Sequence, residues 1–110
     1  MVRKLRSSRL SEWFRYAVGG DPRDEWEFTV AGKHCLVVNG WRSGIALFVE
    51  GTEVARYLKL YSIRGEKPLI SSDIVDGSGG TARVDVYVRA ITGVTMQVRV
   101  NDVPLQDAFI

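Results

Sequence analysis

Residues 83–90 (RVDVYVRA) and residues 94–100 (VTMQVRV) are the stretch that decides the fold of this chain. In both halves, apolar side chains alternate with polar or charged ones, which is the period of a β-strand with one face in the core. Thr92-Gly93 separates the halves and is typical of a tight turn. The sequence therefore predicts an antiparallel hairpin over residues 83–100.

Working outward from this hairpin, the same period recurs along most of the chain. Turn residues such as Gly, Asn and Asp separate short segments rich in Val, Ile, Tyr and Phe. Pro104 has no N–H to donate, so the final strand is expected at a sheet edge. The further strands that we expect cover residues 25–30, 34–38, 45–49, 54–63, 69–75 and 103–105.

Seven or eight strands are too many for one open sheet of this size. The sequence therefore predicts a mainly β domain, built as an antiparallel β-sandwich or a flattened barrel. A shift of 51 residues aligns Cys35 with Val86, Val49 with Val100, and Glu50-Gly51 with Asn101-Asp102. This match is expected of two similar hairpin units, although alternating sequences also align by chance.

The N-terminal segment has a different period. Apolar residues recur at helical spacing and predict an amphipathic helix over residues 8–18, which Gly19-Gly20 and Asp21-Pro22 end. We therefore divide the chain into a basic helix and linker over residues 1–21 and a β-sandwich over residues 22–110. The apolar stripe of this helix, which we expect to cover the sandwich or a second copy, is Leu10, Trp13, Phe14, Ala17 and Val18.

Composition places the chain among ordinary folded domains. Its 110 residues suit one domain, and 45% hydrophobic residues are enough for a core. Residues 1–18 carry five basic side chains and one acidic side chain, a net charge of +4, which leaves −2 for the remainder of a chain whose total is +2. No apolar run approaches the ~20 residues of a membrane span, and Cys35 is the single cysteine. The expected location is the cytoplasm.

Catalytic and metal-binding patterns are missing from the sequence. His34 and Cys35 are the single histidine and the single cysteine, and neighbouring strand residues point to opposite faces. The glycine-rich loop over residues 76–80 runs into a strand, whereas a phosphate loop requires a following helix. We therefore predict a protein that is not an enzyme and that uses no cofactor and no metal.

Binding features remain, and they define the predicted function. The leading prediction is a non-catalytic protein–protein interaction module that self-associates, with Leu10, Trp13, Phe14, Trp41 and Arg42 as partner-binding residues. The alternative is a binder of nucleic acid or an anionic membrane, whose anion-binding residues would be Arg3, Lys4, Arg6 and Arg9. Small-ligand binding through aromatic side chains is a third possibility that no motif indicates.

One segment resembles a known family. The run Gly32-Lys33-His34-Cys35-Leu36-Val37, followed by Gly44-Ile45 and by Leu47-Phe48-Val49-Glu50-Gly51 up to Val54, resembles the strand–loop–hairpin pattern of the Fas apoptosis inhibitory molecule family. The resemblance covers about twenty residues of hairpin pattern. It implies an antiparallel sandwich that acts through protein contacts, without catalysis or a cofactor, and it carries no functional residue over to this chain.

Overall fold

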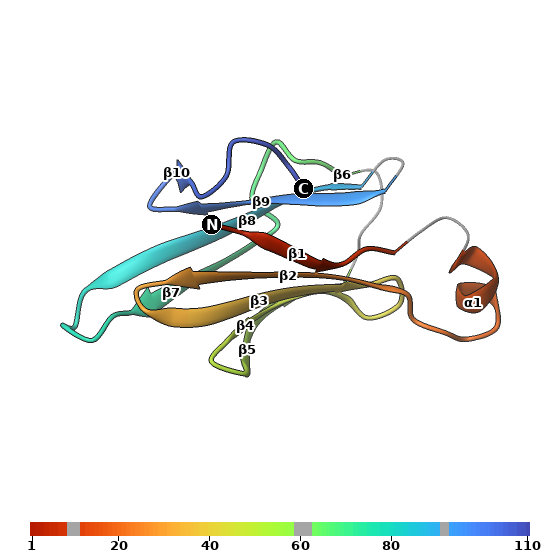
Figure 1. Cartoon of the computed structure of the whole chain (residues 1–110), viewed down its shortest axis with the longest axis horizontal. Coiled ribbons are helices and arrows are strands. Elements are labelled where there is room, and N and C mark those ends of the chain that lie inside the picture. The colour runs from red at the N-terminus through yellow and green to blue at the C-terminus, as the bar shows by residue number, and fades with distance from the viewer. Residues whose placement is uncertain (9–11, 59–62, 91–92) are drawn as a thin grey trace.

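The chain folds into two antiparallel sheets in a computed structural model that describes residues 1–8, 12–58, 63–90 and 93–110 (Figure 1). The first sheet has the order β1-β2-β3-β4-β5. Its strands are β1 (Arg3–Arg6), β2 (Arg23–Val30), β3 (Lys33–Gly40), β4 (Gly44–Val49) and β5 (Thr52–Tyr57). The second sheet has the order β10-β9-β8-β6, and β7 also pairs with β8. Its strands are β6 (Ile63–Arg64), β7 (Ile70–Val75), β8 (Thr81–Ala90), β9 (Val94–Val100) and β10 (Val103–Pro104).

This architecture confirms the mainly β, antiparallel prediction. The decisive hairpin is β8 and β9, in which Val86 pairs with Val98 and Val88 with Met96. The described residues contain ten strands rather than seven or eight. One addition is β1, and the other arises because the predicted strand over residues 54–63 contributes β5 to one sheet and β6 to the other. Pro104 lies in β10, at an edge of the second sheet, as predicted.

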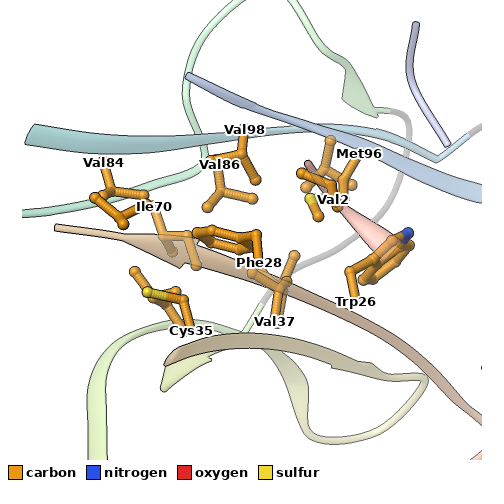
Figure 2. Packing of buried hydrophobic residues seen from close by; sticks show 14 of the residues in the cluster. Val2, Trp26, Phe28, Cys35, Val37, Ile70, Val84, Val86, Met96 and Val98 are labelled. Carbon is orange, nitrogen blue, oxygen red and sulfur yellow. The ribbon is translucent and has the colours of Figure 1, made fainter. Parts of the chain in front are cut away.

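The core lies between the two sheets, as Figure 2 shows. Burial alternates along β2 and along most of β3, which is the physical consequence of the two-residue period. Cys35 is fully buried and its neighbour His34 is exposed, as predicted, and burial raises the pKa of the Cys35 thiol. The largest side chains that are fully buried are Trp26, Ile45, Leu47, Met96, Val37, Val84, Val86, Val88 and Val98.

The two sheets repeat one local arrangement. Glu50 and Asn101 each begin a hairpin turn with left-handed backbone, at φ 50° in both cases. The Glu50 N–H donates to the carbonyl of His34, and the Asn101 N–H donates to the carbonyl of Arg83, both at 2.9 Å. In return, the His34 N–H donates to Glu50 Oε1 at 3.0 Å, and the Arg83 N–H donates to Asn101 Oδ1 at 2.9 Å. The structure therefore contains two similar hairpin units.

The alignment of these units differs from the predicted one in the first strand. Val49 pairs with Cys35 and Val100 pairs with Val84. Cys35 therefore corresponds to Val84, whereas the uniform shift aligned it with Val86. The difference of two residues keeps each side chain on the same face of its strand, so the periodicity of the sequence could not detect it.

The predicted amphipathic helix over residues 8–18 is not shown at that length, because among its described residues only Trp13–Ala17 form an α-helix, α1. Residues Arg3–Arg6, which the prediction assigned to the basic helix and linker over residues 1–21, instead form β1, which pairs with β2 at the edge of the first sheet. The predicted division of the chain after residue 21 therefore falls between β1 and the other strands of the sheet that β1 joins. Residues 3–6 form a strand because β2 offers an unpaired edge, whose backbone groups gain hydrogen bonds from an added strand. The Arg3 guanidinium also forms an ion pair with Glu27 of β2.

Candidate binding surface

Helix α1 stands at one end of an elongated molecule that measures 48 × 26 × 21 Å (Figure 1). The loop that connects β7 and β8 lies at the opposite end. The chain reaches α1 from β1 and leaves it towards β2, so both connections lead into the edge of the first sheet. Such a position exposes most of the surface of a short helix.

The apolar side of α1 faces water. Trp13 is 64% exposed, Phe14 is 71% exposed, and Val18 at the C-cap of the helix is 67% exposed. At about 100° per residue, these three side chains lie within an arc of about 140°. They are the large side chains of the predicted five-residue stripe that the structure describes, and from here the name apolar stripe refers to these three. Leu10, which was predicted to bind a partner together with Trp13 and Phe14, lies outside the described residues. The expectation that the stripe covers the sandwich is therefore wrong for these three side chains.

Tyr16, on another side of α1, contacts the body of the molecule. Its ring lies 5.5 Å from the ring of Trp41, centroid to centroid, at a tilt of 58°. The Arg42 guanidinium lies 4.4 Å from the Tyr16 ring centroid, and it donates to the carbonyls of Gly20, at 3.0 Å, and Tyr16. The structure thus brings Trp41 and Arg42 to α1. Arg42 acts there as an internal support of the helix.

Asp21 completes this support. Its carboxylate accepts hydrogen bonds from the Arg42 N–H and the Ser43 hydroxyl, both at 2.8 Å. Burial raises the pKa of Asp21, but these hydrogen bonds outweigh burial and hold the pKa below its ordinary value. We call Asp21, Arg42 and Ser43 the latch. A Cβ on Gly40 would lie 2.1 Å from Ser43 Oγ, so the latch requires glycine there.

The sequence around Asp21 does not indicate its place in the site. Asp21-Pro22 predicts the end of a helix, which is a local property. The residues of the latch come together through the pairing of β2 with β3, in which Arg23 lies opposite Gly40. That pairing places the residue before Pro22 beside the turn over residues 41–43.

A small hollow opens beside α1. It has a volume of about 240 Å³ and is lined by Tyr16, Gly40, Trp41 and Val94. Tyr16 and Trp41 are each half-buried, so both rings present part of their surface to the hollow and its mouth. The apolar stripe and the hollow therefore lie at the same end of the molecule, on different sides of one short helix.

The predicted anion-binding residues do not form one open patch. Arg3 is exposed and paired with Glu27. Lys4 points the other way, because its Nζ donates to the carbonyls of Val94, at 3.3 Å, and Ile110, at 2.8 Å. Arg6 is exposed, and Arg9 lies outside the described residues. The alternative of an anionic partner stays a prediction. Two of its four residues, Arg3 and Lys4, make internal contacts that would compete with an anion.

The described part of the chain contains no group of three or more His, Cys, Asp or Glu side chains arranged to hold a metal ion. Within the same residues, no helix is long and apolar enough to cross a membrane. Comparisons with protein-family models, with curated proteins and with solved structures find no match to this chain. The resemblance to the Fas apoptosis inhibitory molecule family stays a prediction.

Proposed function

We propose that this chain is a non-catalytic interaction module that contacts protein surfaces, and a second copy of itself in particular, through the apolar stripe. The observation that carries the proposal is the orientation of α1. Trp13, Phe14 and Val18 face water, while Tyr16 holds the helix against the body. Because the latch fixes α1 before any partner arrives, binding loses less conformational entropy than it would for a free segment.

The size of the stripe indicates how strong this contact is. A fully exposed aromatic side chain presents about 150–250 Å². At the observed exposures, the three side chains together present on the order of 400 Å², which is within the range of patches that are often functional. Two stripes would bury on the order of 800 Å² in total. Stable interfaces bury a total of about 1,200 Å² or more. Stripe-to-stripe contact alone would therefore be weak and would depend on concentration.

The test is the molar mass of the full chain by light scattering and sedimentation over a wide range of concentrations. Val18 and Val103 form a matched pair, because they are the same residue type with exposures of 67% and 64%, and Val103 lies in β10, away from α1. We expect Val18→Ser to weaken self-association and Val103→Ser to leave it unchanged. The double variant Trp13→Ser/Phe14→Ser should be a monomer with unchanged circular dichroism.

Salt separates this proposal from the anionic alternative. Apolar contact should persist at high ionic strength, whereas phosphate contacts weaken with a log–log slope of about −0.9 per contact on duplex DNA. A wild-type chain that is monomeric at every accessible concentration would contradict self-association. Binding of that monomer to DNA, lost at high salt and in Arg6→Ala, would replace the proposal with its alternative.

A further inference from the structure

The strand β9 lies at an edge of the second sheet for most of its length, because β10 pairs with Val100 and Arg99 alone. Residues 105–110, which we call the strap, run back along this edge (Figure 1). We propose that the edge of β9 is an acceptor site for an extended segment of a partner protein, and that the strap is an internal cover which such a segment displaces. This inference goes beyond the proposed function, because it concerns a surface other than the apolar stripe.

An edge strand that accepts a further strand has to be regular, and β9 meets this requirement. Over its described length, Val94–Val100, its pairing with β8 contains no register shift, and Arg99 is its single charged residue. The edge strands of the first sheet differ. Three basic residues and a register shift occur in β1, and an ion pair and a register shift occur in β5. Charges and bulges are the features by which proteins block edge-to-edge pairing, so β9 is the edge that requires a cover.

The strap does not cover β9 as a regular strand. The Leu105 N–H donates to the carbonyl of Val98 at 2.9 Å, and the Ile110 N–H donates to the carbonyl of Met96 at 3.0 Å. These donors are five residues apart in the strap, whereas their acceptors are two residues apart in β9. In a regular antiparallel pair the two spacings are equal. Residues 106–109 therefore bulge away from the edge.

Two glutamine side chains take the place of the missing backbone pairing. Gln97 Nε2 donates to the carbonyls of Gln106 and Asp107, both at 3.1 Å, and Gln106 Nε2 donates to the carbonyl of Met96 at 3.1 Å. Gln106 Oε1 is buried and has no hydrogen-bond partner among the described residues. A buried acceptor without a partner is costly. The strap therefore covers the edge less well than a regular strand would.

The contacts of the strap also indicate which segment would replace it. Leu105 and Ile110 are half-buried and pack against the core at this edge. A displacing segment therefore needs aliphatic side chains on the face that turns towards the core. Its regular backbone would exchange hydrogen bonds with both Met96 and Val98, whose carbonyls point to the edge. In such strand addition the main chain supplies affinity, and the positions of alternate side chains supply specificity.

The strap competes with any such segment because it belongs to the same chain. A tethered segment acts at an effective concentration on the order of millimolar. Binding of a free segment to the wild-type chain should therefore be weak, and weakening the strap should strengthen it. This dependence separates a displaceable cover from a permanent part of the sandwich.

The test uses the full chain and a fluorescein-labelled peptide with the sequence of residues 103–110 (VPLQDAFI). The variant Leu105→Ser/Ile110→Ser weakens the strap and leaves the backbone of β9 unchanged. We expect fluorescence anisotropy to give a Kd at least about tenfold lower for this variant than for the wild type, because two half-buried aliphatic contacts of the strap are lost. Hydrogen exchange of the Met96 and Val98 amides, which point to the edge, should slow when the peptide binds.

Two controls accompany this experiment. The chain variant Val103→Ser changes an exposed residue of β10 and should bind the peptide as weakly as the wild type does. A peptide in which Leu105→Ser and Ile110→Ser are both introduced should bind the double variant no better than the wild type binds the unchanged peptide. Where circular dichroism shows that the double variant does not fold, Ile110→Ser alone replaces it, with a smaller decrease in Kd.

A peptide that binds the folded variant no better than the wild type would overturn the proposal and make the strap a permanent part of the sandwich. Dimerisation of the double variant that persists after Val18→Ser is added would also overturn it, because the edge would then belong to a second copy. Neither result bears on the apolar stripe, whose self-association is measured on a chain with an intact strap.

Discussion

At the scale of single residues, Arg42 and Asp21 determine where α1 lies. A helix of five residues is far shorter than the ~12–15 residues at which isolated helices become marginally stable. Its N-cap, Glu12, makes no side-chain capping hydrogen bond. Arg42 compensates by donating to the carbonyls of Tyr16 and Gly20 at the end of the helix, and Asp21 fixes the backbone of Arg42. The position of the stripe therefore depends on side chains outside it.

Asp21→Ala should release α1 without unfolding the sheets. We expect a local loss of about 1–2 kcal/mol, because two hydrogen bonds to a charged group disappear. Hydrogen exchange should quicken at residues 14–20 and stay unchanged in β8 and β9. Asp107→Ala, which changes an exposed acidic residue, serves as the control. Equal exchange in both variants would show that the latch does not support the helix.

The same carboxylate sets a pH dependence. Because the pKa of Asp21 is held below its ordinary value of 3.8 in the folded chain, its charge stabilises the latch at every pH above that value. The contribution is lost as the pH falls through the lower folded pKa. Self-association should therefore be constant from neutral pH down to about pH 4 and weaken below it. Sedimentation across this range checks the expectation, and a midpoint near neutral pH would contradict it.

At the scale of elements, the two hairpin turns at Glu50 and Asn101 share one backbone conformation and one pattern of hydrogen bonds. In each, the side-chain oxygen of a left-handed residue accepts a hydrogen bond from a backbone N–H of the strand that precedes the hairpin, His34 of β3 or Arg83 of β8. Such turns match the right-handed twist of the paired strands. They fix the register of β4 with β5 and of β9 with β10, and through it the faces that form the core.

Asn101→Ala should destabilise the chain by about 1–2 kcal/mol, because the left-handed conformation is costly for alanine and the Arg83 N–H loses its acceptor. Asn101→Asp keeps both the acceptor and a tolerance for this conformation, so its unfolding free energy should stay within about 0.5 kcal/mol of the wild type. Urea denaturation measures both. Equal losses in the two variants would show that the side-chain hydrogen bond contributes nothing.

At the scale of the whole molecule, Lys4 joins the two sheets. It leaves β1 of the first sheet, passes 5.1 Å from the Trp26 ring centroid, and donates to Val94 of β9 and to Ile110. A charged donor that is half-buried between two sheets forms stronger hydrogen bonds than an exposed one. The first residues of the chain thereby stabilise the sandwich instead of a separate helix.

Lys4→Met should lower the free energy of unfolding by about 1.5–3 kcal/mol, because the side chain keeps its length and loses its charged hydrogen bonds. Arg6→Met, at the exposed end of β1, should change it by less than about 0.5 kcal/mol. Urea denaturation with an unchanged m-value would confirm that the compactness of both states is preserved. A neutral Lys4→Met would contradict the role of Lys4 as a link between the sheets.

Several features of this protein follow from the sequence by itself. The two-residue period of residues 83–100 determines the antiparallel hairpin, and the missing N–H of Pro104 places its strand at an edge. The isolated Cys35 in an apolar run is buried, as its neighbours require. The spacing of Trp13, Phe14 and Val18 also places them on one side of a helix. These are local properties, because a period reports which side chains share a face.

Tertiary structure decided what covers each face. Residues 3–6 became a strand because an open edge of β2, about twenty residues away in the sequence, offered backbone hydrogen bonds. Lys4 turned inward because carbonyls of the second sheet lie within its reach. The apolar stripe faces water because Arg42 and Asp21, brought together by the pairing of β2 with β3, hold the opposite side of α1. Such contacts join residues distant in sequence, so no local pattern contains them.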